Sequence, residues 1–196
     1  MSEIKANYCQ FPFKIILASG SPRRKELLKN LGLTFEVKAT QVDEEFPLEL
    51  TAEKIPLYLA EKKAKAYKFE RNDEVVITSD TIVWLDGNVM NKPLDYNEAK
   101  NMLIKLSGKK HQVYTAVCIN SKLKKILFYD KTDVYFKSLS LGEIDYYINN
   151  FPVYDKAGSY GVQDWLGLIG IEKIEGCFYN VMGLPIKKVY EHLINF

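Results

Sequence analysis

A six-residue segment near the N-terminus has the residue types of a phosphate-binding loop. Ser19-Gly20-Ser21-Pro22-Arg23-Arg24 follows an apolar run and precedes leucines at helical spacing, so it lies where a strand turns into a helix. Helix N-termini favour anions, and adjacent arginines are unfavourable there unless an anion offsets their charge. The segment lacks the Lys-Ser/Thr ending of a Walker A loop. It predicts a phosphate site that includes Ser19; a Ser-Pro helix cap with two exposed arginines is the alternative.

Arginine is rare in this chain, which draws attention to the adjacent pair. Only Arg23, Arg24 and Arg71 occur among the 27 basic residues, and the other basic residues are lysines. A guanidinium binds phosphate or carboxylate oxygens in a planar, two-pronged geometry, whereas lysine is a flexible point charge. We therefore expect Arg23 and Arg24 to hold phosphate oxygens. Arg71 lies in a predicted loop and is assigned to the surface.

Asp80 is an acidic residue inside a sequence typical of a buried strand, Val75–Trp84. Burying a carboxylate costs free energy unless it is hydrogen-bonded, paired or bound to a cation. Asp80 is therefore a candidate metal ligand or general base. The structural alternative is a carboxylate at a strand end that pairs with a nearby lysine.

Three further charged residues are weaker candidates on their own. Asp86-Gly87 predicts a tight hairpin that returns the chain towards Asp80 and brings Lys92 with it. Lys63 lies on a predicted helix, and Glu44 lies in an acidic stretch. A second carboxylate would help Asp80 to hold Mg²⁺. Surface positions for the two lysines and a solvated loop for Glu44 are the alternatives.

The glycine-rich segment Asp155–Gln163 is the fourth candidate. Its glycines permit close backbone approach and unusual φ angles. The Gln163 amide offers both a donor and an acceptor, which suits the edge of a nucleotide base. Without further context, this segment is an ordinary loop.

The elements that would position these residues follow from periodicity and turn residues. Strands are expected at Lys14–Ala18, Thr34–Ala39, Val75–Leu85, Asn88–Met90, His111–Ile119, Lys125–Tyr129 and Thr132–Ser138. Helices are expected after Ser21, over Ile55–Tyr67, from Asp95 to Gly108, after Ser140 and over Pro185–Ile194. Alternating strands and fully apolar strands together favour an α/β fold on a mixed sheet.

Composition excludes several classes of protein. The net charge of +2 and the 47% apolar content are typical neither of a nucleic-acid-binding domain nor of a disordered chain. No apolar run is long enough for a membrane span, and the N-terminus lacks a signal-peptide centre, so we expect a cytoplasmic protein without membrane contact. Cys9, Cys118 and Cys177 are too far apart for a metal clip and are expected to be reduced. The two histidines make no zinc pattern, which favours an oxygen-liganded ion such as Mg²⁺.

Taken together, these segments resemble the Maf family of nucleoside triphosphate pyrophosphatases. The resemblance extends from Ile15 to about Tyr190, and six segments carry it in the same order: Leu17–Arg24, Ser79–Val83, Lys92-Pro93, Leu106–Gly108, Asp155–Gln163 and Val181–Pro185. It implies a single domain over residues 1–196, in which about the first 13 residues are an extension. The implied fold is α/β, with an elongated central mixed sheet flanked by helices and a cleft between two lobes, as in the Ham1, or inosine triphosphate pyrophosphatase-like, proteins.

The resemblance also implies roles for individual residues. The triphosphate would be held by Ser19, Arg23, Arg24, Lys63 and Lys92. Asp80 and Glu44 would hold a divalent cation, Mg²⁺ or Mn²⁺, with Asp80 as the proton acceptor for water attack on the α-phosphorus. Arg24, Thr81 and Gln163 match the specificity positions of members that hydrolyse dTTP and UTP. Modified uridine triphosphates are further candidate substrates.

Two alternative functions remain open from the sequence. One is a pyrophosphatase that clears non-canonical purine triphosphates such as ITP. The other is a nucleotide-binding regulator of cell division, since Maf relatives are linked to septum formation. The near-neutral charge argues against nucleic-acid binding. The resemblance implies a homodimer.

Overall fold

The structure of the chain is a computed structural model that describes residues 10–196. Within these residues a seven-stranded mixed sheet has the order β2-β1-β3-β5-β6-β7, and β4 pairs with β3. Strand β1 is parallel to β2 and β3, and the other pairings are antiparallel. The strands are β1 (Lys14–Leu17), β2 (Phe35–Val37), β3 (Glu74–Leu85), β4 (Asn88–Met90), β5 (Lys110–Asn120), β6 (Lys125–Phe136) and β7 (Ile171–Glu175).

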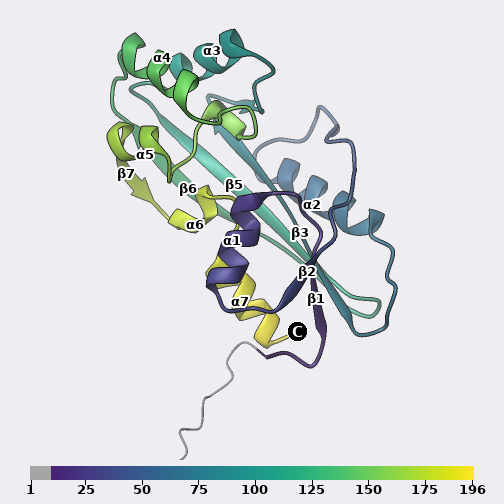
Figure 1. Cartoon of the computed structure of the whole chain (residues 1–196). Helices are drawn as coiled ribbons and strands as arrows, with labels where there is room; N and C mark the ends of the chain where they lie inside the picture. The colour runs from purple at the N-terminus through teal and green to yellow at the C-terminus, as the bar shows by residue number, and fades with distance from the viewer. Residues whose placement is uncertain (1–9) are drawn as a thin grey trace, which may run out of the picture.

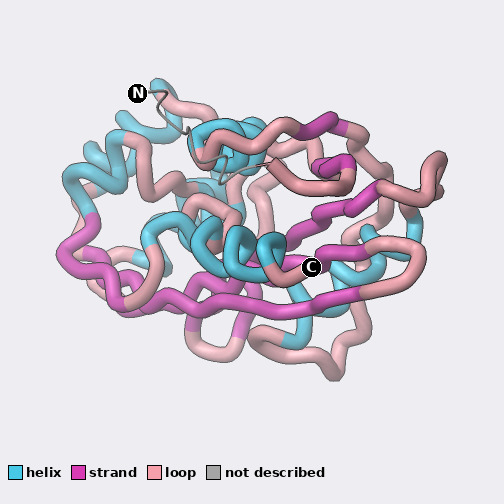
Figure 2. The backbone as a smooth tube through the Cα atoms, turned by 90° about the horizontal axis from the view of Figure 1, so that it is seen from below, coloured by secondary structure: helices cyan, strands magenta, loops and turns pink. Residues whose placement is uncertain are grey.

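Helices cover both faces of this sheet, which extends along most of the length of the molecule (Figures 1 and 2). Helix α2 packs on one face, and two groups of helices, one with α1 and α7 and one with α3 and α4, pack on the other. The helices are α1 (Pro22–Asn30), α2 (Lys54–Ala66), α3 (Tyr96–Leu106), α4 (Leu141–Asn150), α5 (Trp165–Gly170), α6 (Phe178–Val181), α7 (Ile186–Ile194) and the 3-10 turn η1 (Ala157–Ser159).

Alternation of side chains along β3 explains why two lobes form on one face. Val75 and Ile77 join a core with α1 and α7, which we call the α1–α7 lobe. Val83 and Leu85, on the same face, join a core with α3 and α4, which we call the α3–α4 lobe. The two residues between these pairs on that face are Ser79 and Thr81, because side chains alternate with period two. Two separate apolar cores therefore leave a polar gap between them.

The edge of β3 is also open at this point. Strand β1 pairs with β3 only as far as Ile77, and β4 pairs with it only from Val83. Among the described strands, none covers this edge between those two residues. Asp80 lies in the middle of this gap, and its side chain points to the opposite face, towards α2. The open edge gives other parts of the chain access to the backbone of β3.

Most of the predicted elements are confirmed. The hairpin between β3 and β4 turns at Asp86 and Gly87, whose φ angles of 49° and 82° are typical of a tight primed turn. Ser140 and Glu143 form the expected capping box at the start of α4. Cys118 is buried, which raises the pKa of its thiol to about 11. Cys9 lies outside the described residues.

Three local predictions need correction. The predicted strands Lys125–Tyr129 and Thr132–Ser138 are one continuous strand, β6, because it pairs with β5 along its whole length. The predicted strand Thr34–Ala39 is reduced to Phe35–Val37. Ser21 stands at the N-cap of α1 without a capping bond from its side chain; its N–H instead donates to Oγ of Ser19 at 3.2 Å.

No helix in residues 10–196 is long and apolar enough to cross a membrane.

Acid sensitivity of the fold follows from His111, which is fully buried in β5. Burial lowers the pKa of its imidazole to about 3, against a partial opposing effect of Asp133. The unfolded chain takes up this proton near pH 6.5, whereas the folded protein does not. Stability should therefore fall below pH 6.5, with a slope approaching about 1.4 kcal/mol per pH unit.

Urea unfolding between pH 6.5 and 5 measures this effect, because the pKa values of carboxyl groups lie lower. His111→Gln should flatten the pH dependence in that window. An unchanged slope in His111→Gln would show that another group carries the sensitivity.

Candidate active site

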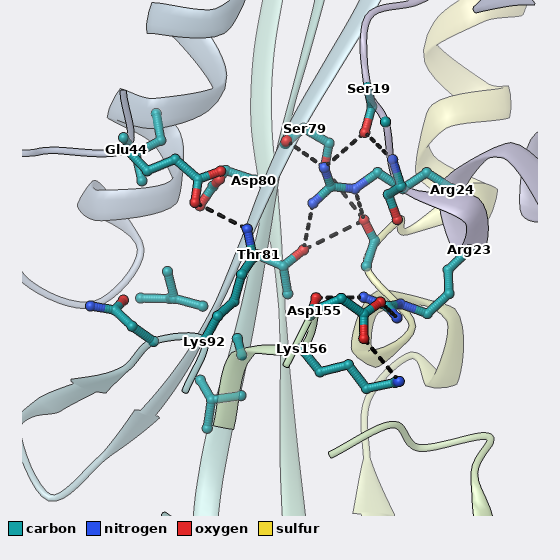
Figure 3. A pocket seen from close by; sticks show the side chains of 18 of the residues that line it. Ser19, Arg23, Arg24, Glu44, Ser79, Asp80, Thr81, Lys92, Asp155 and Lys156 are labelled. Atoms are coloured by element: carbon teal, nitrogen blue, oxygen red, sulfur yellow. Dashed lines mark hydrogen bonds and ion pairs between the residues drawn. The ribbon is translucent and has the colours of Figure 1, made fainter. Parts of the chain in front are cut away.

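A cavity of about 1040 Å³ lies at the gap between the two lobes. Figure 3 shows part of its lining, with Glu44, Asp80 and Lys92 on one side and Arg23 and Arg24 on the other. All nine predicted site residues line this cavity, namely Ser19, Arg23, Arg24, Glu44, Lys63, Asp80, Thr81, Lys92 and Gln163. They come from segments up to 144 residues apart (163 − 19), and the fold brings them to one place.

Two carboxylates and two lysines form the charged side of the cavity. The Lys63 ammonium donates to Oδ1 of Asp80 at 2.6 Å and to Oε1 of Glu44 at 2.9 Å. Lys92 donates to the other carboxylate oxygen of Glu44 at 3.1 Å. Asp80 is only 6% exposed, so its charge depends on these neighbours. Lys92 therefore reaches Asp80 indirectly, through Glu44 and Lys63.

Glu44 is ionised throughout the neutral pH range. Burial alone would raise the pKa of its carboxyl group, but hydrogen bonds and charges from Lys63 and Lys92 outweigh this and hold the pKa at about 2. Its neighbour Asp43 pairs with Lys62 at an exposed site instead. Within the acidic stretch Asp43–Glu45, Glu44 is therefore the residue that contacts Lys63, the partner of the buried Asp80.

The carboxylate pair suits a hard divalent cation. Oδ1 of Asp80 and Oε1 of Glu44 already share one cationic group, the Lys63 ammonium. Mg²⁺ takes oxygen ligands and is commonly held by one or two carboxylates together with substrate phosphates. The described residues hold no cluster of three or more His, Cys, Asp or Glu side chains placed for a metal. The protein's own donors would therefore be these two carboxylates.

Arg24 is the most heavily bonded side chain in the cavity. Its Nε donates to the carbonyl of Gly183 at 2.9 Å, and one Nη donates to the carbonyl of Ser79 at 2.8 Å and to Oγ of Ser19 at 3.3 Å. The other Nη donates to Oγ1 of Thr81 at 3.1 Å. These contacts join α1, the open edge of β3 and the turn after α6. Because protein acceptors engage all three of its nitrogens, Arg24 is a scaffold for the other groups.

Arg23 has a different environment. It donates to Oδ2 of Asp155 at 2.7 Å and to the Asp155 carbonyl at 3.2 Å, which connects the α1–α7 lobe to the α3–α4 lobe. Asp155 also contacts Lys156, which is only 5% exposed and lies 3.3 Å from Asp164. Asp155 and Lys156 are functional candidates that sequence reasoning quoted but gave no role. Their signal was a pair of charges directly before a glycine-rich turn.

Comparison with known proteins identifies the family of this chain. The family model described as "Maf-like protein" matches residues 14–196. The chain belongs to the Maf family. It is 53% identical over 183 residues to a protein of Phocaeicola vulgatus named dTTP/UTP pyrophosphatase, covering 92% of this chain and 95% of the relative.

Two further relatives carry the same name. A protein of Cytophaga hutchinsonii is 51% identical over 91% of this chain and 82% of its own length, and one of Flavobacterium psychrophilum is 50% identical over 93% and 94%. Among solved structures, the Staphylococcus aureus Ham1 protein is 16% identical with a TM-score of 0.42, covering 63% of this chain and 71% of that protein. The family assignment rests on the sequence matches.

In this Maf protein, Gly183 is a site residue that sequence reasoning missed. Its φ of 108° lies in the region that favours glycine, and its carbonyl accepts hydrogen bonds from Arg24 and, at 3.4 Å, from Ser79. The only local signal was its place in Met182-Gly183-Leu184-Pro185. A Cβ at this position would lie 3.5 Å from Oγ1 of Thr81 and 3.7 Å from Nε of Arg24, so the glycine leaves these two groups without a side chain against them.

Thr81 and Gln163, the two remaining specificity candidates, differ in whether their side chains already have hydrogen-bond partners in the protein. The Thr81 hydroxyl is bonded to Arg24 and lies 3.0 Å from Oγ1 of Thr115 on β5. Gln163 is exposed on the cavity wall, and its side chain makes no hydrogen bond within the described residues. The Gln163 amide is therefore available to a bound molecule, while the Thr81 hydroxyl is already oriented by protein groups.

The scaffold role of Arg24 predicts a loss of stability in Arg24→Lys. A lysine cannot reach the same set of acceptors, and each buried carbonyl left unpaired costs about 1–3 kcal/mol. We expect the free energy of unfolding to fall by about 2–4 kcal/mol.

Urea denaturation of Arg24→Lys and of Arg71→Lys provides the test. Arg71 is the matched control, because within the described residues its guanidinium donates only to Asp73, two residues away on the surface. Arg71→Lys should unfold like the parent protein. Equal stability of the two variants would mean that the contacts of Arg24 with β3 and with the turn after α6 do not stabilise the fold.

Proposed function

We propose that this protein is a nucleoside triphosphate pyrophosphatase that hydrolyses dTTP and UTP to the monophosphate and pyrophosphate. The observation that carries the proposal is the charged side of the cavity, where Lys63 joins the buried Asp80 to Glu44 across from the N-terminal end of α1. A triphosphate needs concentrated positive charge, and water activation needs a carboxylate; this cavity has both. The names of the relatives support the choice of substrates.

The basic groups around the cavity would hold the triphosphate. Lys63, Lys92 and Arg23 carry positive charge on its wall, and Ser19 and the N-terminal end of α1 lie beside them. Arg23 and Lys92 now bond to carboxylates, so a polyanion would compete with Asp155 and Glu44 for them. Phosphoryl-type reactions ask the protein mainly for positioning and charge neutralisation, which these groups would supply.

Asp80 would accept the proton of the attacking water. Lys63 donates to its Oδ1, and within residues 10–196 its Oδ2 has no hydrogen-bond donor. The water oxygen would attack the α-phosphorus, and the bond from that phosphorus to the bridging oxygen would break. Pyrophosphate would leave with that oxygen, while the water proton passes to Asp80.

Asp80 and Glu44 are also the residues that would hold a divalent cation. When bound, Mg²⁺ or Mn²⁺ would neutralise charge on the phosphate oxygens. The fit rests on the two carboxylate oxygens that share the Lys63 ammonium. Added chelator should therefore abolish turnover, and added Mg²⁺ should restore it.

A pyrophosphate-release screen tests the proposed function. The panel should contain the common ribo- and deoxyribonucleoside triphosphates, modified uridine triphosphates and ITP, each with Mg²⁺. We expect the highest kcat/KM for dTTP and UTP. A preference for ITP would assign the protein to purine clearance, and no pyrophosphate release from any nucleotide would refute an enzymatic role.

Asp80→Asn should lower kcat for UTP by at least about 10³-fold, because the amide cannot accept the water proton. Nucleotide binding should largely persist, since the basic groups remain. Asp43→Asn is the matched control: it lies next to Glu44 but pairs with Lys62 on the surface, and its kcat should not change. If Asp80→Asn retained most of its turnover, another residue would be the proton acceptor.

Gln163→Glu should change base preference more than phosphate affinity, because the amide lies free on the cavity wall. The ratio of kcat/KM for dTTP to that for GTP should fall by about tenfold, while inhibition by pyrophosphate should change little. Gln112→Glu, on β5 outside the cavity lining, serves as the control. An unchanged dTTP/GTP ratio would count against the base-reading role of Gln163.

A further inference from the structure

A short chain of hydroxyl groups lies on the floor of the cavity between the two lobes. Thr81 on β3 and Thr115 on β5 are directly opposite in the antiparallel register, and their Oγ1 atoms are 3.0 Å apart. Thr115 is fully buried and continues the chain to the backbone carbonyl of Asn180 in α6, at 2.8 Å. Each hydroxyl has one proton, so the direction of donation along this chain is determined by its ends.

The far end of the hydroxyl chain, the backbone carbonyl of Asn180, can only accept a hydrogen bond. The Asn180 carbonyl has no proton to give, so Thr115 donates to it and uses its single proton there. The position of this carbonyl is secured by the Asn180 side chain, which donates to the carbonyl of Val113 at 3.0 Å and to Oγ1 of Thr132 at 2.9 Å. In the pair of threonines, Thr81 is therefore the donor and Thr115 the acceptor.

The near end of the chain agrees with this direction. Arg24 has only donors, so it takes up one lone pair of the Thr81 oxygen and cannot accept its proton. The other acceptor near Thr81 is the carbonyl of Gly183. It lies 3.5 Å away, at the outer limit of a hydrogen bond, and Arg24 already donates to it at 2.9 Å. The proton of Thr81 thus points at Thr115, away from a bound molecule.

We propose that Thr115 is a positioning residue that makes the Thr81 hydroxyl an acceptor towards the substrate, so that the site selects bases with a ring N–H. This inference rests on the proposed function, in which Thr81 reads the base. Uracil and thymine carry a proton on N3, whereas cytosine has a lone pair there. A site that hydrogen-bonds its substrate discriminates strongly against an analogue that leaves a polar group unpaired. Discrimination against an analogue that differs only in size is weaker. The fixed proton of Thr81 would therefore favour UTP and dTTP over CTP.

Thr115→Val and Thr115→Ser test this role. Valine has nearly the shape of threonine but offers no acceptor, so the Thr81 proton becomes free to turn towards the cavity. The Asn180 carbonyl keeps a partner in the N–H of Gly183 at 3.0 Å, so no buried acceptor is stranded. Serine keeps the hydroxyl and should restore the parent behaviour.

The measurements are kcat/KM values for UTP, CTP and N3-methyl-UTP. The parent protein should prefer UTP strongly over both of the others. In Thr115→Val the UTP/CTP ratio should fall by at least about tenfold, mainly through a lower KM for CTP, because Thr81 can now donate to N3 of cytosine. N3-methyl-UTP should stay poor in every variant, since its N3 offers neither a proton nor a lone pair. Thr115→Ser should keep the parent ratio within about twofold.

Three results would overturn the proposal. They are an unchanged UTP/CTP ratio in Thr115→Val, an equal shift in Thr115→Ser, and a gain for CTP and N3-methyl-UTP together, which would mean a loosened pocket. Failure of the proposed function is distinct, because the parent protein would then release no pyrophosphate from UTP or dTTP. If the parent protein hydrolyses UTP but the UTP/CTP ratio of kcat/KM does not change in Thr115→Val, the role of Thr115 is refuted and the proposed function is not.

Discussion

The arrangement of the site depends on one side chain, Arg24, and on the polar gap that it fills. Two apolar cores pack on the same face of β3, and between them the strand presents Ser79 and Thr81 at an edge that the described strands leave open. A planar, charged donor that reaches backbone carbonyls and hydroxyls on three segments stabilises such a gap without closing it. The same fork that joins α1 to β3 and to the turn after α6 also orients the groups on the cavity floor.

Charge on the other side of β3 is balanced in a different way. Asp80 points to α2, where Lys63 approaches from one turn of the helix and Glu44 from the loop before it. A buried carboxylate held by a single ammonium is sensitive to any change in its partner. Because Glu44 contacts both Lys63 and Lys92, a polyanion that binds the lysines would redistribute charge over the whole group. The alternation of β3 thus separates this charged cluster, on the α2 face, from the hydroxyl chain, on the face that carries both lobes.

Several features of the site were predictable from local sequence. A buried strand interrupted by a single aspartate, a small-residue turn before a helix, and a two-residue hairpin signal all have local physical causes, and the structure contains each of them. The break in the apolar alternation of β3 at Ser79 and Thr81 was also readable. This break coincides with the gap between the two cores. The gap itself exists only because two separate pairs of helices pack on this face of the sheet.

The sequence by itself determined which chemical groups the protein has and which elements carry them, because helix starts, turns and strand periodicity depend on neighbouring residues. Only the tertiary structure decided how these groups pair. It directs the donors of Arg24 to protein acceptors, places Asp155 against Arg23 from 132 residues away, and sets Thr115 opposite Thr81. Such contacts depend on strand register and on how helices pack across the sheet. A hydroxyl has no preferred donor direction in a sequence, and it acquires one only when a buried carbonyl stands at the end of its chain.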